Sequence, residues 1–460
     1  MMGLLMPHAA VVLPEVGGED AAQVRVSYDA MLRIAREASE LQPDIVVVVS
    51  PHGPVFADAF AVWGGQRIAG NLSEFGASQI HVDCRLDQEV RELLLMRCTD
   101  RRINAFELEE STAREYGLAR ELDYGVVVPF YFLQKSGLEA PVLHIAVSGL
   151  SRFEHYRLGM AIGDVLTDLG RRAVVIASGD CSHRLTDDAP AGYHTDGARF
   201  DKLLRHWVET SNVAEILFAD EELVANAAED VLRPLSVLFG CFDRCQISLR
   251  IISYEGPFGV GYLTASFIGV SGSTRYPDIV AFRDQLVQKR RMKEHRYVKL
   301  AREALEIFVR EGRVMDPPDD LVNRENRKAI FVSIKKDGEL RGCIGSLEPT
   351  ENSLPEAIIR YAIEAGTEDP RFFPVEQEEL SSLLYTVDVL GQPEPVTSFQ
   401  QLDPARYGII VSDGCEKGVL LPGIPGIDSV QEQFAVAREK AGIEPDREVK
   451  ISRFTVERFY

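Results

Sequence analysis

The sequence predicts an α/β layered domain with a mainly parallel sheet, followed by a smaller α+β domain. Over the first 270 or so residues, short runs of β-branched residues alternate with stretches of helical periodicity. Strands that alternate with helices in this way indicate a parallel sheet. The pattern changes after a turn-rich segment at 271–278, SGSTRYPD. A chain of 460 residues is also too long for one ordinary hydrophobic core, so at least two domains are expected.

The first domain is expected to span residues 1–272. Buried strands are predicted from four apolar runs: IVVVV at 45–49, VVV at 126–128, PVLHIAV at 141–147 and AVVIA at 173–177. Helical spacing of apolar residues predicts helices at 28–41, 157–169 and 196–209. The final stretch, 246–270, is typical of two strands around a turn rich in Gly and Pro, and it closes the domain.

A linker is predicted at 273–294 and a second domain at 295–460. The basic run KRRMKEHRYVK at 289–299 is interpreted as a solvated linker or helix face. From Val298 onward, apolar residues at helical spacing predict an amphipathic helix. Short strands are predicted at 329–334, 383–390 and 408–412, with two further helices, which indicates an α+β domain.

Composition excludes several classes of partner and location. The chain has 50 basic and 71 acidic residues, a formal net charge of −21, which disfavours binding to nucleic acid or to anionic membranes. The N-terminal segment lacks the basic region of a signal peptide, and no apolar run is long enough to cross a membrane. Seven cysteines without framework spacing indicate reduced thiols. We therefore expect a cytoplasmic protein; its oligomeric state is left open.

Three histidines lie where a site is expected in such a fold. His52 and His183 each follow a predicted buried strand, the position at which open α/β sheets bind ligands, and His8 follows the apolar N-terminal run. Two histidines and one carboxylate form the usual open site for non-haem Fe(2+). Spacing alone does not choose the carboxylate among the acidic candidates, which are Asp180, Glu229 and Glu255.

The first 270 residues resemble the class III extradiol ring-cleaving dioxygenase superfamily (LigB-type), which also contains the Memo proteins. The matching segments are PHAAVVLP, VVVVSPHGP, IASGDCSH and AAEDVLRPLSVLFG. The resemblance implies that His8, His52 and Glu229 bind iron and that His183 is a general acid/base beside the substrate. Such a ligand set also accepts Mn, Co or Zn.

One segment departs from the pattern of the ring-cleaving members. They usually carry LDHG, whereas this chain has LDYG, which places Tyr124 where histidine is expected. Tyrosine titrates near pH 10 and cannot exchange protons near neutrality as histidine does. His194 is interpreted either as a neighbour of the site or as part of a surface loop. Asp180 either shapes the turn before His183 or orients that ring, and we favour the turn.

Residues 295–460 resemble the AMMECR family through LRGCIG at 340–345, DPRFFPV at 369–375 and GVLLPGIPG at 418–426. Cys343 lies between two glycines and is a candidate nucleophile or metal ligand, although a packed thiol is the commoner case. No histidine occurs in 296–460, which excludes a Cys–His pair within this domain. We infer a binding or assembly role, with Arg341 and Cys343 as candidate contacts.

The order of the two regions resembles the two-domain component of bacterial AmmeMemoRadiSam systems, which implies a radical SAM partner protein. The chain itself has no CxxxCxxC motif. Three functions follow as hypotheses. The first is an extradiol-dioxygenase-like non-haem Fe(2+) oxidoreductase that acts on a catechol-like or other metal-chelating small molecule. The others are a metal-dependent enzyme without ring cleavage, and a scaffold that binds the partner.

Overall fold

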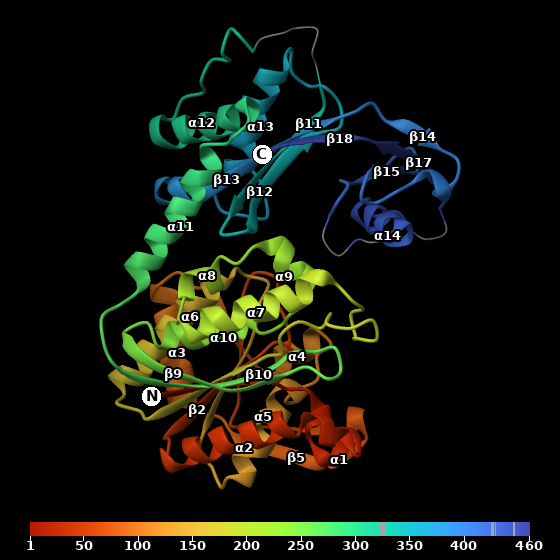
Figure 1. Ribbon diagram of the computed structural model, residues 1–460. Coiled ribbons are helices and arrows are strands. Elements are labelled where there is room, and N and C mark those ends of the chain that lie inside the picture. Colours follow the sequence, from red (N-terminus) through yellow and green to blue (C-terminus); the bar gives the residue numbers. More distant parts are fainter. Residues whose placement is uncertain (322–327, 425–426, 428, 445–446) are drawn as a thin grey trace. The chain divides into compact units, whose positions relative to one another are not determined.

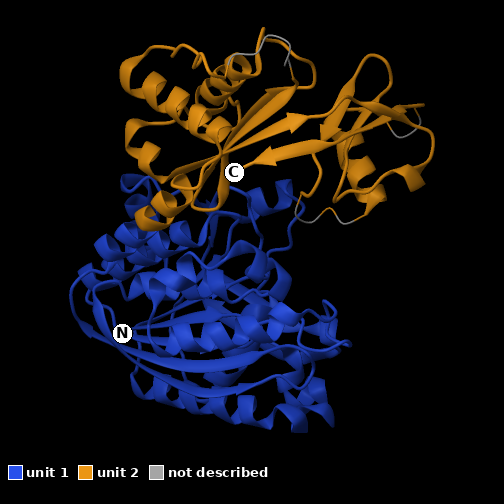
Figure 2. Ribbon diagram, turned by 45° about the horizontal axis from the view of Figure 1, so that its top comes forward, with its two compact units in different colours: residues 1–283 blue, residues 284–460 orange. Residues whose placement is uncertain are grey.

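The computed structural model describes residues 1–460 except 322–327, 425–426, 428 and 445–446. The chain divides into two compact units, residues 1–283 and 284–460 (Figure 2). The first unit is α/β with a large, mainly parallel sheet, and the second contains small antiparallel sheets, so the predicted fold classes are confirmed.

The first unit is built on an eight-stranded sheet. In spatial order its strands are β6 (Ala105–Leu108), β3 (Phe60–Trp63), β7 (Val142–Ala146), β2 (Ile45–Ser50), β8 (Ala173–Ser178), β1 (Met2–Met6), β10 (Tyr262–Ser271) and β9 (Cys245–Glu255). The central strands β7, β2, β8 and β1 are parallel, and the β9–β10 hairpin is added antiparallel at one edge. A small hairpin, β4 (Arg67–Leu72) and β5 (Ala77–Arg85), lies outside this sheet.

Helices cover both faces of this sheet, because its central strands, such as β2, carry apolar side chains on both faces. Successive side chains of a strand point to opposite faces. Val47 and Val49 pack into a core with α3 (Gln88–Asp100), α6 (Arg152–Asp168), α7 (Thr195–Glu209) and α10 (Leu232–Cys241). Val46 and Val48 pack into a second core with α2 (Arg25–Glu40) and α5 (Tyr124–Lys135) (Figure 1). An all-apolar strand therefore fits a sheet that is buried on both faces. The remaining short helices are α1 (Pro14–Gly17), α4 (Glu110–Glu115), α8 (Val213–Leu217) and α9 (Glu221–Ala227).

One predicted strand is wrong. The run VVV at 126–128 lies within helix α5. All three valines are fully buried in the core formed with α2. Burial on every side removes the alternation that distinguishes a strand from a helix, and tertiary packing here outweighs the β propensity of valine.

The second unit contains two four-stranded sheets and separate small cores. The first sheet has the order β12 (Glu339–Ser346), β11 (Ile330–Lys336), β13 (Leu383–Leu390) and β18 (Val456–Phe459). The second has the order β14 (Glu394–Val396), β17 (Lys450–Phe454), β15 (Gly408–Ser412) and β16 (Lys417–Leu420). Helices α12 (Arg296–Glu311) and α13 (Leu354–Thr367) pack with the first sheet, and α14 (Val430–Lys440) packs with the second.

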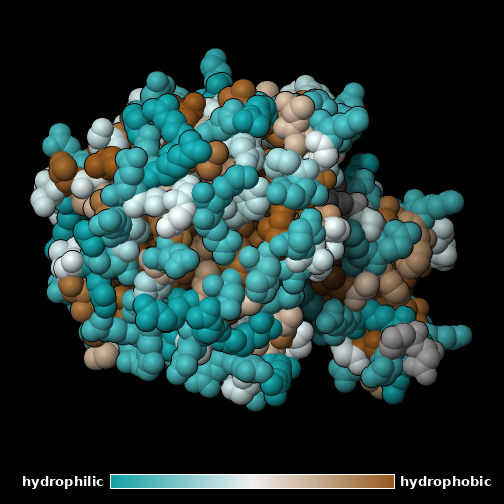
Figure 3. Space-filling view, turned by 90° about the horizontal axis from the view of Figure 1, so that it is seen from below, coloured by the Kyte–Doolittle hydropathy of each residue, from teal (hydrophilic) through white to brown (hydrophobic). Residues whose placement is uncertain are grey.

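The residues predicted as a linker, 273–294, contain helix α11 (Tyr276–Arg291), which crosses the boundary between the units. None of the helices in the described part of the chain combines the length and the apolar character needed to cross a membrane. Hydrophilic side chains cover most of the face shown in Figure 3, with hydrophobic ones scattered among them. This agrees with the strongly charged composition.

Candidate metal centre

Neighbouring strands of the central sheet carry the candidate residues to one edge. His8 follows β1, His52 follows β2, and Asp180 follows β8. These strands are adjacent and parallel in the order β2, β8, β1, so their carboxyl ends meet at the same edge. Asp230, which immediately precedes α10, reaches the same place. The sheet topology thus assembles a site from residues more than 200 positions apart.

Two imidazoles and one carboxylate converge at this edge. The Nε2 atoms of His8 and His52 lie 2.9 Å apart. The Oδ2 atom of Asp230 lies 3.2 Å from His8 Nε2 and 3.4 Å from His52 Nε2. Within the described ranges, this is the one group of three or more side chains whose ligand atoms all lie within 4.8 Å of one another. Its donors are those of the 2-His-1-carboxylate sites that bind Fe, and they also suit Mn, Co and Zn.

The acidic member of this group differs from the prediction. Glu229, the predicted ligand, accepts a hydrogen bond of 2.7 Å from the backbone N–H of Leu232. The first N–H groups of a helix have no partner within the helix, so Glu229 satisfies one at the start of α10. Burial raises the pKa of Glu229 to about 7. The structure places Asp230, the next residue, beside the histidines instead.

Hydrogen bonds to the backbone and to a serine orient His8. The hydroxyl of Ser178 donates to the carbonyl of Gly125, so it accepts from Nδ1 of His8, 3.1 Å away. In the neutral ring the proton is therefore on Nδ1, and Nε2, which faces His52 and Asp230, is the nitrogen that can bind a cation. The backbone N–H of His8 donates to Asp180 Oδ1 at 3.1 Å. Neither contact was predicted from the sequence.

The cluster is electrostatically suited to a cation. Burial by itself lowers the pKa of His8, but the carboxylates of Asp180 and Asp230 outweigh that effect and raise it to about 9. Burial acts to raise the pKa of Asp230, and His8 and His52 hold it well below its usual range. The backbone N–H of Asp180 donates to Asp230 Oδ1 at 2.7 Å and fixes this carboxylate. Two buried carboxylates beside two imidazoles are a favourable environment for a divalent ion.

His183 lies beside this cluster, and its ring is held by the backbone. Its Nδ1 lies 2.7 Å from the carbonyl oxygen of Ala228, which can only accept a hydrogen bond. Nδ1 therefore carries the proton, and Nε2 remains a proton acceptor. The ring is close enough to Asp180 and Asp230 to interact with them electrostatically. The position suits an acid/base group next to the metal ligands.

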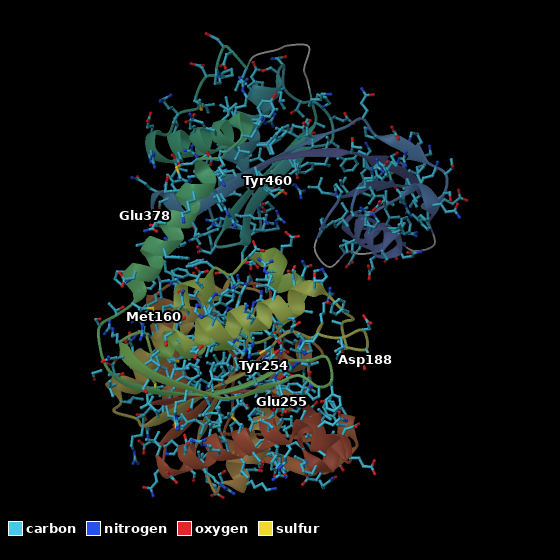
Figure 4. The ribbon with its side chains drawn as sticks, viewed as in Figure 1. Met160, Asp188, Tyr254, Glu255, Glu378 and Tyr460 are labelled. Carbon is cyan, nitrogen blue, oxygen red and sulfur yellow. The ribbon has the colours of Figure 1, made fainter. Side chains whose placement is uncertain are left out.

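The residue before His183 is fixed by a buried carboxylate. Ser182 donates its backbone N–H to Asp201 Oδ1 at 2.8 Å. The hydroxyl of Tyr254, labelled on β9 in Figure 4, donates to Asp201 Oδ2 at 2.6 Å. Asp201 is 2% exposed, and burial raises its pKa to about 6. It is a candidate positioning residue that the sequence did not reveal.

Ionisation of Asp201 is expected to reduce stability as the pH rises. Its folded pKa lies above the unfolded value near 3.9, so the folded chain binds the proton more tightly. The stability that protonated Asp201 contributes to the folded state is fully present below about pH 4 and is lost as the pH rises through about 6. We expect the free energy of unfolding to fall by about 2 kcal/mol relative to Asp201→Asn between pH 4 and 7. Urea titrations of both proteins in a chelator measure this; a constant difference would contradict it.

Tyr124 is in direct contact with His52. Its hydroxyl oxygen lies 2.8 Å from His52 Nε2 and 3.1 Å from Nδ1. The two rings are stacked, with centroids 4.2 Å apart, so the hydroxyl lies over the imidazole rather than in its plane. Burial raises the pKa of Tyr124 further above its usual value. At neutral pH this group is a hydrogen-bond donor and not a base.

Other predicted candidates take structural positions. Asp180 accepts a hydrogen bond from the backbone N–H of His8, and its Oδ2 lies 3.7 Å from His8 Nε2. Nδ1 of His194 accepts from the backbone N–H of Asp196 at 3.1 Å, so His194 caps the start of α7. Glu255, at the end of β9 (Figure 4), accepts from the backbone N–H of Ser27 at 2.6 Å in the first turn of α2. Glu255 and His194 therefore stabilise helix starts and are not members of the cluster formed by His8, His52 and Asp230.

A second row of polar residues supports His52. The backbone N–H of His52 donates to Ser50 Oγ at 3.2 Å, and the Ser50 hydroxyl donates to Asp123 Oδ1. His144 Nε2 lies 3.5 Å from Asp123 Oδ2, and its side chain is fully buried. Asp123 belongs to the LDYG segment. An acidic residue beside Tyr124 in that segment could have suggested from the sequence that a carboxylate supports His52.

In the second unit, the LRGCIG segment forms β12. Arg341 is held by two hydrogen bonds to Glu379, at 3.1 and 2.9 Å. Cys343 donates its backbone N–H to Asp369 Oδ2 at 2.8 Å. Burial raises the pKa of the Cys343 thiol, so it is protonated at neutral pH and is a poor nucleophile. The contacts of Arg341 and Cys343 therefore hold β12 against neighbouring segments of the second unit.

Gly342 is expected to tolerate no side chain. A Cβ atom there would lie 2.0 Å from the carbonyl oxygen of Ala365 on α13. We expect Gly342→Ala to lower the free energy of unfolding of the second unit by about 3 kcal/mol, because strand and helix must separate. Cys343→Ser, a change of one atom at the next position, is the control and should cost less than about 1.5 kcal/mol. Thermal unfolding of both variants compares them; equal losses would contradict the packing argument.

Comparisons with known proteins agree with this structure. Residues 2–265 match the family model "Catalytic LigB subunit of aromatic ring-opening dioxygenase", and residues 298–459 match AMMECR1. The protein CA_C1420 of Clostridium acetobutylicum is 36% identical over 458 residues, which cover 99% of this chain and 98% of that protein. A Thermotoga maritima protein is 48% identical over 172 residues, 36% of this chain and 98% of that one.

Among solved structures, the uncharacterized protein PH0010 from Pyrococcus horikoshii is 34% identical, with a TM-score of 0.34. The match covers 35% of this chain and 88% of that one. The LigB match extends over more than half of the chain, and the Clostridium protein aligns with this chain over nearly the full length of both. The chain therefore belongs to the family of the catalytic LigB subunit of aromatic ring-opening dioxygenases, with an AMMECR1 domain after it.

Proposed function

We propose that the protein is an extradiol-dioxygenase-like oxidoreductase that uses non-haem Fe(2+) and acts on a catechol-like or other metal-chelating small molecule. The observation that carries this proposal is the convergence of His8, His52 and Asp230 in a domain of the LigB family. Iron held by these residues would bind substrate and oxygen on one ion and allow electrons to pass between them. Mn, Co or Zn would fit the same donors.

The residues around the metal ligands have separate tasks in this proposal. His183 accepts the proton of a substrate hydroxyl at Nε2, because its Nδ1 is already bonded to a carbonyl. Tyr124 donates a hydrogen bond from its hydroxyl and does not accept a proton, because its pKa is raised. Ser178 holds the Nδ1 proton of His8 and so keeps the Nε2 lone pair available.

The test is oxygen consumption by protein loaded with Fe(2+) under anaerobic conditions and then mixed with catechols and air-saturated buffer. We expect uptake of one oxygen molecule for each catechol consumed, together with the visible absorbance of a ring-opened product. Protein stripped of metal is the control and should consume none. Full iron occupancy without oxygen uptake on any catechol would contradict ring cleavage.

Tyr124 supports a second candidate, a metal-dependent reaction without ring cleavage. A protonated tyrosine beside His52 cannot provide the second base of the ring-cleaving members. In this version the substrate is prepared by a radical SAM protein, a partner suggested by the order of the two domains. This candidate predicts bound metal, no oxygen uptake with catechols, and recovery of a radical SAM protein with the tagged full chain.

A further inference from the structure

A cavity of about 430 Å³ lies beside the metal ligands in the first unit. His52 and Tyr124 form part of its wall, so the cavity adjoins a residue of the metal cluster. The rest is built by the loop after β2, the end of β4 with the turn that follows, and the segment that leads into α5. Its volume is within the range of small-molecule sites.

The charged residues of the cavity wall are acidic. Glu74, Glu121 and Asp123 line it, and no Lys or Arg occurs among the described residues of the wall. The nearby Arg120 directs its guanidinium to the carbonyl oxygens of Gly64 and Arg67.

Two buried polar atoms in the wall have no hydrogen-bond partner in the described part of the chain. They are Nε1 of Trp63, whose side chain is 1% exposed, and Oδ2 of Asp123, which has only the longer contact of 3.5 Å to His144 Nε2. A buried polar atom without a hydrogen bond costs free energy, and native proteins keep few of them. Trp63 and Tyr124 also provide aromatic rings, and such rings attract cations. A cationic group would satisfy the carboxylates of the wall, whereas the N–H of Trp63 is itself a donor and would be satisfied by an acceptor atom of the same ligand, such as a hydroxyl oxygen.

We propose that this cavity binds the substrate and selects molecules with a positively charged amine over aromatic acids. The chelating end would lie toward His52, and the ammonium group would lie among Glu74, Glu121 and Asp123. This inference rests on the proposed function for the assignment of the chelating end to the metal. The carboxylate of an aromatic acid would be repelled in this cavity, because the charged side chains of the wall are also negative.

The test compares catechols that are matched in size and differ in charge. Dopamine is cationic, 4-ethylcatechol, which has the dopamine side chain without the amine, is neutral, and 3,4-dihydroxyphenylacetate is anionic at pH 7. Calorimetric titration uses the full chain loaded with Zn²⁺, which binds the same donors without redox chemistry. We expect dopamine to bind at least about tenfold more tightly than the acid, with the neutral compound between them. Equal affinities, or a preference for the acid, would overturn the inference.

A double variant locates the source of the preference. Glu74→Gln with Glu121→Gln removes two exposed charges of the wall and should reduce the preference for dopamine at least about threefold. Glu139→Gln is the control, because Glu139 is exposed and lines a different cavity. An unchanged preference in the double variant would overturn the inference.

Metal content of the same samples separates the two proposals. Bound Zn²⁺ without charge preference contradicts the cavity assignment alone. A preference for dopamine in protein that binds no metal contradicts the proposed function alone. A protein that binds no metal and shows no preference for dopamine would contradict both proposals.

Discussion

Replacing Asp230 by Asn is expected to lower the affinity for metal by at least about 100-fold, whereas Glu229→Gln should leave metal content close to that of the wild type. The Oδ2 atom of Asp230 forms a triangle with the Nε2 atoms of His8 and His52, with sides of 2.9, 3.2 and 3.4 Å. Asparagine keeps the shape and can still accept the hydrogen bond from the backbone of Asp180, so the change removes mainly the negative charge. A neutral amide is a much weaker ligand for a divalent ion.

Glu229→Gln is a matched control because it changes the adjacent residue in the same way. Its side-chain oxygen can still accept from the Leu232 N–H at the start of α10. Metal content would be measured by elemental analysis after anaerobic purification, and affinity by competition with a chromophoric chelator. Thermal melting of both variants shows that each is folded. Loss of metal in the Glu229 variant with retention in the Asp230 variant would reverse the assignment.

Replacing His183 by Gln is expected to reduce kcat with the metal-bound protein by about 10²–10⁴-fold and to leave metal content unchanged. The effect follows from loss of the proton acceptor, since glutamine keeps a donor for the Ala228 carbonyl but has no basic nitrogen. The measurement is the rate of oxygen uptake with the catechol that the wild type consumes, together with iron content of the same sample.

His194→Gln is the control for this experiment. His194 is the same residue type in the same region, but it caps α7 and has no contact with the metal ligands in the described structure. Its variant should retain nearly all activity. Equal rates for the wild type and the His183 variant would remove His183 from the proton-transfer step, and iron loss in that variant would make it a ligand.

Local patterns were sufficient for the main features of the fold. The apolar runs at 45–49 and 173–177 are buried strands because every residue in them faces a helix layer on one side of the sheet or the other. Histidines just after such strands could be placed at one edge, since parallel strands end together. The run at 126–128 was assigned incorrectly because a fully buried helix has the same apolar pattern as a buried strand.

The choice between Glu229 and Asp230 depended on packing between distant segments. Gly179 lies against Val231, where a Cβ on the glycine would come within 2.5 Å of the Val231 Cα. This close approach brings the segment before α10 next to the turn after β8, and the N–H of Asp180 then bonds Asp230. Neighbouring side chains in such a segment point in different directions, and no periodic pattern encodes which one faces the histidines.

The acidic cavity was also invisible in the sequence, because Glu74 lies in the turn after β4, whereas Glu121 and Asp123 lie in the segment before α5, more than 40 residues later. Strand and helix patterns arise from contacts that repeat at a constant spacing, so one segment contains enough information to predict them. A site is formed by side chains that meet only after the sheet, its helices and the connecting loops have packed. Residue types at strand ends therefore indicated a candidate metal site and its location, while the carboxylate that faces the two histidines and the charge of the adjacent cavity arose from tertiary contacts.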